Sequence, residues 1–173
     1  MDAGCGSGLV GTLISDLTSR LVGVDMSAAM LEKAAEKGVY AQLCQDDLVS
    51  FMTNHSDRYD AVTCAATLIH FGDLAPAFEA AAACLRDGGI FVFTLFPNDG
   101  ELSEQDIIVA ANLGYATGGC YAHSSSYVRR IAESTGFSVE ILDSVIHEYE
   151  FGKPVMGLIV ALRRRFRTAQ TVQ

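Results

Sequence analysis

The stretch Met1–Thr12, MDAGCGSGLVGT, decides the fold, because its glycines are spaced for a loop that leads from a strand into a helix. Gly6, Gly8 and Gly11 fit the G-x-G-x-x-G pattern of a dinucleotide-binding loop, and Asp25 follows at a suitable distance to bind a ribose. Glycine lets the backbone approach a ligand closely, since no Cβ intervenes. The stretch therefore predicts a nucleotide-type ligand held beside the start of a helix.

A second spacing in the same stretch is an acidic residue followed by alternate glycines, Asp2, Gly4, Gly6 and Gly8. A charged side chain fits poorly in the buried strand that precedes a dinucleotide loop. It fits a site for S-adenosylmethionine well, because that ligand carries an ammonium and a sulfonium as well as a carboxylate. S-adenosylmethionine is therefore favoured over a nicotinamide dinucleotide as the cofactor.

Acidic residues also end the next two predicted strands. Asp25 follows the strand at 21–24, and Asp47 comes just after the strand at 42–44. Ligands of open α/β sheets bind at the carboxyl ends of the strands. We expect Asp25 to accept hydrogen bonds from both ribose hydroxyls and Asp47 to accept one from the adenine amino group, with the Leu48 N–H facing a ring nitrogen.

Apolar residues complete the predicted cofactor site. Met26 and Met30 are expected to pack on the face of the adenine, and Ala3 and Ala65 to lie against the ligand. Each acidic residue taken alone could instead be a cap or a turn former. Their placement at the ends of successive strands favours the binding site.

Strand-like and helical runs alternate through most of the chain. Strands are expected at 21–24, 42–44, 60–64 and 90–96, and helices at 27–35, 48–52 and 76–85. This alternation predicts a doubly wound, Rossmann-like α/β fold with a mostly parallel sheet. A helix at 126–135 and strands at 139–149 and 158–162 follow, and the two strands should form an antiparallel hairpin because their connection is too short for a crossover helix. We expect a single domain over residues 1–173.

Only Met1 precedes Asp2, so the sequence shows no apolar strand before the glycine loop. The fold is therefore expected to lack its first strand, at the centre of the sheet between the strands that end at Asp25 and Cys64. Losing that strand would leave backbone groups unpaired on two inner edges. We expect the chain to be N-terminally incomplete; the alternative is that Met1 is the true start and another element fills the gap.

Composition excludes several classes of partner. The net charge of -9 argues against general binding of nucleic acid or of an anionic membrane, and no apolar run approaches the length of a membrane span. The five cysteines form no C-x-x-C pair, which predicts a reducing, cytoplasmic location and no metal site. Oligomeric state leaves no signal in the sequence.

Four segments resemble the successive motifs of class I S-adenosylmethionine-dependent methyltransferases: DAGCGSG at 2–8, LVGVDMSAAMLEKA at 21–34, DRYDAVTCAATLIHFGDLAPAF at 57–78 and LRDGGIFVFTLF at 85–96. More narrowly, GVY at 38–40, GDLAPAF at 72–78, CYAHSSSYVRRIAESTGF at 120–137 and GKPVMGLIVALRR at 152–164 resemble the TPR-repeat-associated methyltransferases. The resemblance implies methyl transfer from S-adenosylmethionine and a seven-stranded sheet that closes with an antiparallel hairpin.

Methyl transfer from a sulfonium requires mainly orientation and exclusion of water. A general base is needed only for a hydroxyl or protonated amine acceptor, and histidine is the usual base. His70 lies in a segment that the resemblance places at the methyl group, although it could instead brace its loop. Tyr121 and His123, in a predicted loop before the last helix, are candidate acceptor-site residues, although His123 could simply be exposed.

The sequence as a whole predicts a methyltransferase that acts on a small-molecule acceptor. Three alternatives stay open. They are a non-catalytic module that binds S-adenosylmethionine, a nicotinamide-dependent oxidoreductase, and a protein methyltransferase.

Overall fold

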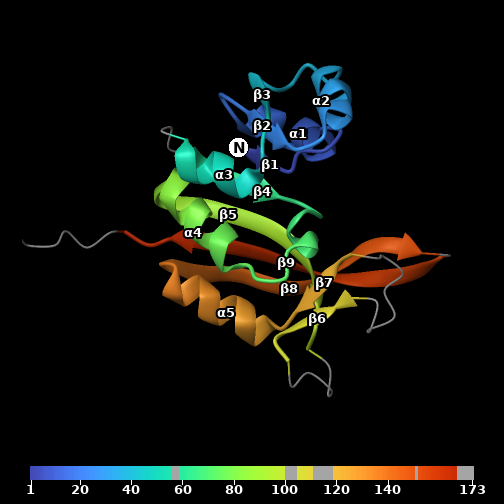
Figure 1. The fold of residues 1–173 in the computed structure, drawn as a ribbon, viewed down its shortest axis with the longest axis vertical. Coiled ribbons are helices and arrows are strands. Elements are labelled where there is room, and N and C mark those ends of the chain that lie inside the picture. Colours follow the sequence, from blue (N-terminus) through green and yellow to red (C-terminus); the bar gives the residue numbers. More distant parts are fainter. Residues whose placement is uncertain (56–58, 100–104, 111–118, 151, 167–173) are drawn as a thin grey trace, which may run out of the picture.

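The computed structural model describes residues 1–55, 59–99, 105–110, 119–150 and 152–166, which form an α/β fold around one sheet (Figure 1). The strands are β1 (Asp2–Ala3), β2 (Val22–Asp25), β3 (Gln42–Gln45), β4 (Tyr59–Cys64), β5 (Leu85–Pro97), β6 (Ile107–Val109), β7 (Tyr121–His123), β8 (Phe137–Glu150) and β9 (Lys153–Arg164). The helices are α1 (Leu9–Ile14), α2 (Ala28–Ala35), α3 (Leu48–Asn54), α4 (Ala75–Cys84) and α5 (Ser125–Ser134), with short 3-10 turns η1 (Ser15–Leu17) and η2 (Leu68–His70).

The sheet has the predicted mixture of parallel and antiparallel strands. Strands β3, β2, β1, β4 and β5 lie in that order and are parallel, as βαβ units require. Strand β9 pairs antiparallel with β5, and β8 pairs antiparallel with β9. The doubly wound fold and its C-terminal hairpin are therefore confirmed.

The strand position before the glycine loop holds two residues. Strand β1 lies between β2 and β4, where the first strand was predicted, and it pairs in parallel with both. Met1 extends this pairing, because the N–H of Thr63 donates to its carbonyl at 2.9 Å. A two-residue strand thus occupies the position that was expected to be empty, and it joins β2 to β4.

Helices α3, α4 and α5 lie side by side over the sheet, and α1 and α2 lie beside β1–β3, across from α3 (Figure 1). Phe78 of α4 fills the centre of the main core, with its ring 5.7 Å from that of Phe91 and 5.3 Å from that of Phe93 on β5. Capping side chains begin three of the helices, because Ser27, Asp47 and Ser124 each accept a backbone N–H of the first turn.

The described part of the chain differs from the sequence expectation in several places, first in the number of strands: its sheet has nine, where the resemblance implies seven. Strand β7 replaces the predicted loop around Tyr121 and His123, since it pairs with the end of β5 and with β6. Helix α4 ends at Cys84, because Leu85 already pairs with Tyr59 and begins β5. In the described part of the chain, no helix combines the length and the apolar character that a membrane crossing requires.

Candidate functional site

Two adjoining cavities lie at the carboxyl ends of β1, β2 and β4. The larger, of about 480 Å³, is lined mainly by the glycine loop, and the smaller, of about 300 Å³, by residues that follow β2 and β3. Both cavities are lined by Gly4, Asp25, Thr67 and His70. The cavities therefore lie at the edge of the sheet where the sequence predicts the ligand, and the two have these four lining residues in common.

The glycine loop adopts backbone angles that glycine alone adopts readily. Gly4, Gly6 and Gly8 have φ values of 69°, 51° and 85°. The N–H groups of Gly4 and Cys5 donate to the carbonyl of Val24 at 2.8 and 3.0 Å, which fastens the loop to β2. A Cβ placed on Gly6 would meet no atom within 4 Å, so the backbone there is open to a ligand.

Asp25, at the end of β2, is fixed by two backbone donors. Its Oδ2 accepts the N–H of Gly6 at 2.8 Å, and its Oδ1 accepts the N–H of Ser27 at 2.9 Å. A carboxylate oxygen can accept a second hydrogen bond. Since Asp25 lines both cavities, the two oxygens are held in place for a pair of neighbouring hydroxyl donors such as those of a ribose.

Asp2 is buried, with 1% of its surface exposed, at the base of the larger cavity. The Tyr40 hydroxyl donates to its Oδ2 at 2.7 Å and the Thr63 hydroxyl to its Oδ1 at 3.1 Å. Burial raises the pKa of Asp2, and these two hydrogen bonds act in the opposite direction. A cationic group in the cavity would stabilise the charged carboxylate further.

Tyr40 is a site residue that the sequence analysis missed. A Cβ on Gly11 would lie 2.1 Å from the Tyr40 oxygen, and one on Gly23 would lie 2.9 Å from its ring. The glycines of α1 and β2 therefore leave room for the tyrosine that holds Asp2. Gly11, the last glycine of the literal dinucleotide pattern, serves this packing.

The smaller cavity carries all but one of the residues predicted for the adenine end; the exception, Met30, lines the larger cavity. Met26, Asp47 and Leu48 line the smaller cavity, together with Phe71. Asp47 also caps α3, since its Oδ1 accepts the N–H of Ser50 at 2.9 Å. Met26 is 70% exposed, so its side chain is accessible to a ligand in this cavity.

The loop after β4 forms the wall between the cavities and was only partly predicted. Ala65 lines the larger cavity as expected. Ala66 has a φ of 52°, a strained value for alanine, and its N–H donates to the Thr94 hydroxyl at 2.9 Å. The Thr67 hydroxyl donates to the carbonyls of Gly4 and Ala65, at 3.3 and 3.1 Å, so this loop and the glycine loop are joined.

The three predicted catalytic residues are not brought together. His70, exposed at the end of η2, lines both cavities, whereas Tyr121 and His123 line neither. The ring of Tyr121 lies against Gly72. His123 is fully buried, and its Nε2 is 2.9 Å from the Gly72 carbonyl, to which the ring N–H donates. Burial lowers the pKa of His123. The expectation that His123 could be exposed is therefore wrong: it braces the loop that carries His70.

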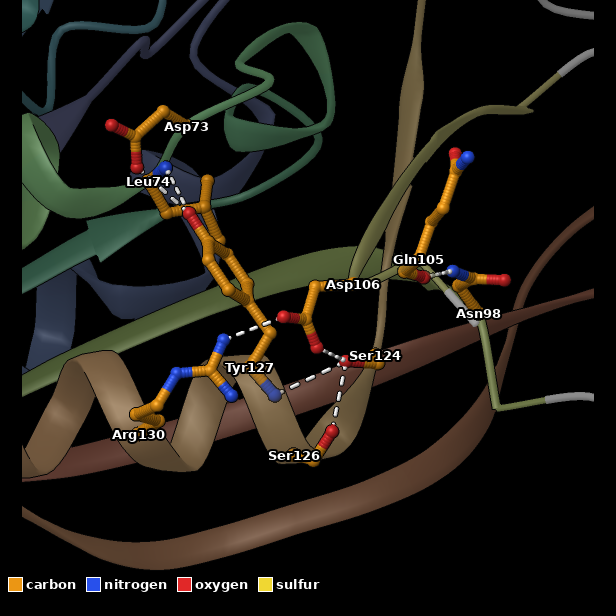
Figure 2. A network of polar contacts seen from close by, with 9 residues as sticks. All are labelled: Asp73, Leu74, Asn98, Gln105, Asp106, Ser124, Ser126, Tyr127 and Arg130. Carbon is orange, nitrogen blue, oxygen red and sulfur yellow. Dashed lines mark hydrogen bonds and ion pairs between the residues drawn. The ribbon is translucent and has the colours of Figure 1, made fainter. Parts of the chain in front are cut away.

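A network of polar contacts extends this brace (Figure 2). The Tyr127 hydroxyl accepts the N–H of Leu74 at 2.9 Å and donates to Asp73 Oδ1 at 2.8 Å. Asp106 accepts from the Ser124 hydroxyl at 2.9 Å and from Arg130 at 2.6 Å. Helix α5 and β7 are thus tied to the segment 70–74 that borders the cavities.

The residues predicted to bind the cofactor fall into two groups, those that line a cavity and those that do not. The members that line a cavity are Asp2, Gly4, Gly6, Asp25, Met26, Met30, Asp47, Leu48 and Ala65. Ala3 and Gly8 line neither cavity; they are buried and support the loop. Across the described residues, no group of three or more His, Cys, Asp or Glu side chains is arranged to hold a metal ion.

The order of the strands in the sheet and the glycine loop are those of the class I S-adenosylmethionine-dependent methyltransferases. The family described as "Methyltransferase domain" matches residues 1–93, and the chain belongs to that family.

Solved methyltransferases share the fold over nearly the whole chain. The magnesium protoporphyrin IX methyltransferase of Synechocystis PCC 6803 with bound SAH matches with a TM-score of 0.70 and 20% identity, over 94% of this chain and 72% of that one. A putative methyltransferase of Bacillus halodurans C-125 matches with a TM-score of 0.74 and 18% identity, over 95% of this chain and 91% of that one.

Among curated proteins, the ubiquinone biosynthesis O-methyltransferase of Coxiella burnetii is 30% identical over 99 residues, 54% of this chain and 42% of the relative. The protein of the same name from Saccharophagus degradans is 32% identical over 98 residues, with the same coverage. The chain thus spans less than half the length of the curated relatives it matches.

Proposed function

We propose that the chain is an S-adenosylmethionine-dependent methyltransferase whose acceptor is a small molecule. The observation that carries the proposal is the fixed carboxylate of Asp25 beside the open backbone of Gly6. Both oxygens of Asp25 are held by backbone N–H groups at the carboxyl edge of the sheet, with one acceptor position left on each. When bound, the cofactor would supply an activated methyl group on sulfur.

The residues present fit that cofactor along its whole length. Asp25 would hold the ribose hydroxyls, and Asp47 with the Leu48 N–H would hold the adenine edge beside Met26. Asp2, already stabilised by Tyr40, would face the ammonium group. His70 lines both cavities and is placed to contact the acceptor.

Further features support the finer parts of the proposal. Relatives named as O-methyltransferases of ubiquinone biosynthesis favour a small-molecule oxygen acceptor. The net charge of -9 speaks against nucleic acid as a partner. None of the five cysteines, all of them among the described residues, forms a disulfide, which agrees with a cytoplasmic location. The narrower likeness to TPR-repeat-associated methyltransferases stays a prediction.

Titration calorimetry with S-adenosylhomocysteine tests the cofactor site. Wild-type protein should bind it, and Asp25→Ala should weaken binding by about 2–4 kcal/mol, or roughly 30- to 700-fold in Kd, because charge-assisted hydrogen bonds to two hydroxyls are lost. Asp143→Ala, an exposed position on β8 outside both cavities, is the matched control and should bind like wild type. Equal affinity of the two variants would exclude the assigned ribose site.

Two further measurements separate the alternatives. A nicotinamide dinucleotide that raises the melting temperature, where S-adenosylhomocysteine does not, would favour an oxidoreductase. Labelled methyl groups from S-adenosylmethionine, supplied with a small-molecule extract, should enter the small-molecule fraction. Label in protein would indicate a protein methyltransferase, and cofactor binding without any transfer would indicate a binding module.

A further inference from the structure

A histidine–cysteine pair lies at the rim of both cavities. Cys120, which directly precedes β7, places its Sγ 3.6 Å from Nδ1 of His70. The cysteine is 2% exposed and belongs to an apolar cluster with Ile69 and Phe96, whereas His70 is exposed and lines the cavities. Because Nδ1 is turned toward the interior, Nε2 on the other side of the ring is left for the cavity.

The direction of this hydrogen bond follows from the chemistry of the two groups. The unprotonated nitrogen of a neutral imidazole is a good acceptor, whereas a thiol sulfur is a weak one. Among the described residues, Nδ1 of His70 lies within hydrogen-bond distance of the buried Cys120 thiol, so an S–H bond to Nδ1 satisfies that thiol. An N–H directed at sulfur would instead pair a strong donor with a weak acceptor.

We propose that Cys120 is a positioning residue that fixes His70 in the Nε2–H tautomer, so that His70 presents a hydrogen-bond donor, and not a base, to the methyl acceptor. The nitrogen that carries the proton in a histidine is set by the bond that the other nitrogen makes. The statement about the acceptor rests on the proposed methyltransferase function. The statement about the tautomer does not.

A donor at this position selects a class of acceptor. An Nε2–H group binds and orients an oxyanion, such as a carboxylate or a phenolate, and does not accept the proton of an alcohol. An oxyanion already holds the electron pair that forms the new oxygen–carbon bond, sulfur keeps the pair of the bond that breaks, and no proton has to leave. The chain would then contribute orientation and exclusion of water, without a general base.

Imidazole nitrogen NMR of ¹⁵N-labelled protein tests the tautomer without any ligand. At about pH 8, where exposed imidazoles are neutral, His70 should show a protonated Nε2 and an unprotonated Nδ1, with its signals assigned by their loss in His70→Gln. Cys120→Ala should move the two nitrogen signals toward each other, because the ring then samples both tautomers. Cys120→Ser keeps a donor and should restore the wild-type pattern.

The matched control is Cys84→Ala, since Cys84 is equally buried but donates to the Ala81 carbonyl within α4. It should leave the His70 signals unchanged. A protonated Nδ1 in the wild type, or identical His70 signals in wild type and Cys120→Ala, would overturn the positioning role.

The acceptor class is tested with two probes of the same shape, benzoate and benzyl alcohol, added to protein saturated with S-adenosylhomocysteine. Benzoate should shift the His70 Nε2–H signal clearly more than benzyl alcohol at the same concentration, because a charged oxygen is the stronger acceptor. Equal shifts, or none with either probe, contradict the oxyanion assignment. Failure of S-adenosylhomocysteine to bind would count against the proposed function, while the tautomer result would stand independently.

Discussion

The two sides of the candidate site are built in different ways. On the proposed cofactor side, residues 2–8, 25–30 and 46–48, the ribose-binding carboxylate of Asp25 is held by backbone groups: the bond from Gly6 to Asp25 spans 19 residues, and the one from Ser27 to Asp25 spans two. The proposed acceptor side, residues 70–74 with 120–127, is held by side chains far apart in sequence. The contact between His123 and Gly72 spans 51 residues.

The two kinds of construction suit two different requirements, constant binding of one cofactor and adjustable binding of an acceptor. Backbone donors and positive-φ glycines build a site that depends on a short local pattern, which suits one unchanging cofactor. Side-chain contacts between a loop and a distant strand can be altered one residue at a time without disturbing the sheet. We therefore expect changes on the acceptor side to affect stability or acceptor choice, while cofactor affinity stays constant.

The largest effect is expected where the two sides meet, at Gly4. An added Cβ would lie 2.3 Å from the Thr67 hydroxyl oxygen, and Gly4 already has a φ of 69°. Gly4→Ala should lower the free energy of unfolding by about 2–4 kcal/mol, since backbone strain and overpacking add. Urea denaturation measures this loss.

Gly6→Ala is the matched comparison. Gly6 also has a positive φ, 51°, but a Cβ there meets no atom within 4 Å. Only the backbone term of about 1–2 kcal/mol should remain. If both variants lose the same stability, the Thr67 contact does not join the two loops as described.

Sequence patterns predict the cofactor side better than the acceptor side, for the same physical reason. Asp25 and Asp47 are recognisable because each ends a short strand and precedes a helix. Tyr40 was missed because its role depends on Asp2, 38 residues away, and on the space above two glycines. Strand β7 was missed because its three residues are too few to show the apolar–polar alternation of a strand. It is recognised only by its pairing with the end of β5.

Tyr127→Phe should lower the free energy of unfolding without changing the affinity for the cofactor. The lost hydroxyl accepts the N–H of Leu74 and donates to Asp73, and burial raises the pKa of Tyr127 to about 12, so it is a protonated donor at neutral pH. Leaving the buried Leu74 N–H without this acceptor should cost about 1–2 kcal/mol in urea denaturation.

The affinity of Tyr127→Phe for S-adenosylhomocysteine should equal that of wild type, since Tyr127 lines neither cavity. A clear loss of affinity would mean that the two sides are coupled. Arg130→Ala provides the control within the same network (Figure 2), because its ion pair with Asp106 is exposed and should contribute under about 1 kcal/mol.

The smallest change at neutral pH is expected for His123→Gln, whose amide can still donate to the Gly72 carbonyl. Burial lowers the pKa of His123 in the folded protein, so on acidification the unfolded chain takes up this proton first. The free energy of unfolding of the wild type should therefore decrease as the pH drops below the ordinary histidine range. In His123→Gln this decrease should be smaller, because the variant has no histidine at that position to take up a proton on unfolding. Urea denaturation at about pH 7.5 and about pH 5.5 measures the difference.

His123→Ala should share the reduced pH dependence but be less stable at both pH values, because it also leaves the Gly72 carbonyl without its donor. A glutamine variant with the full wild-type pH dependence would show that His123 is not held neutral by the fold.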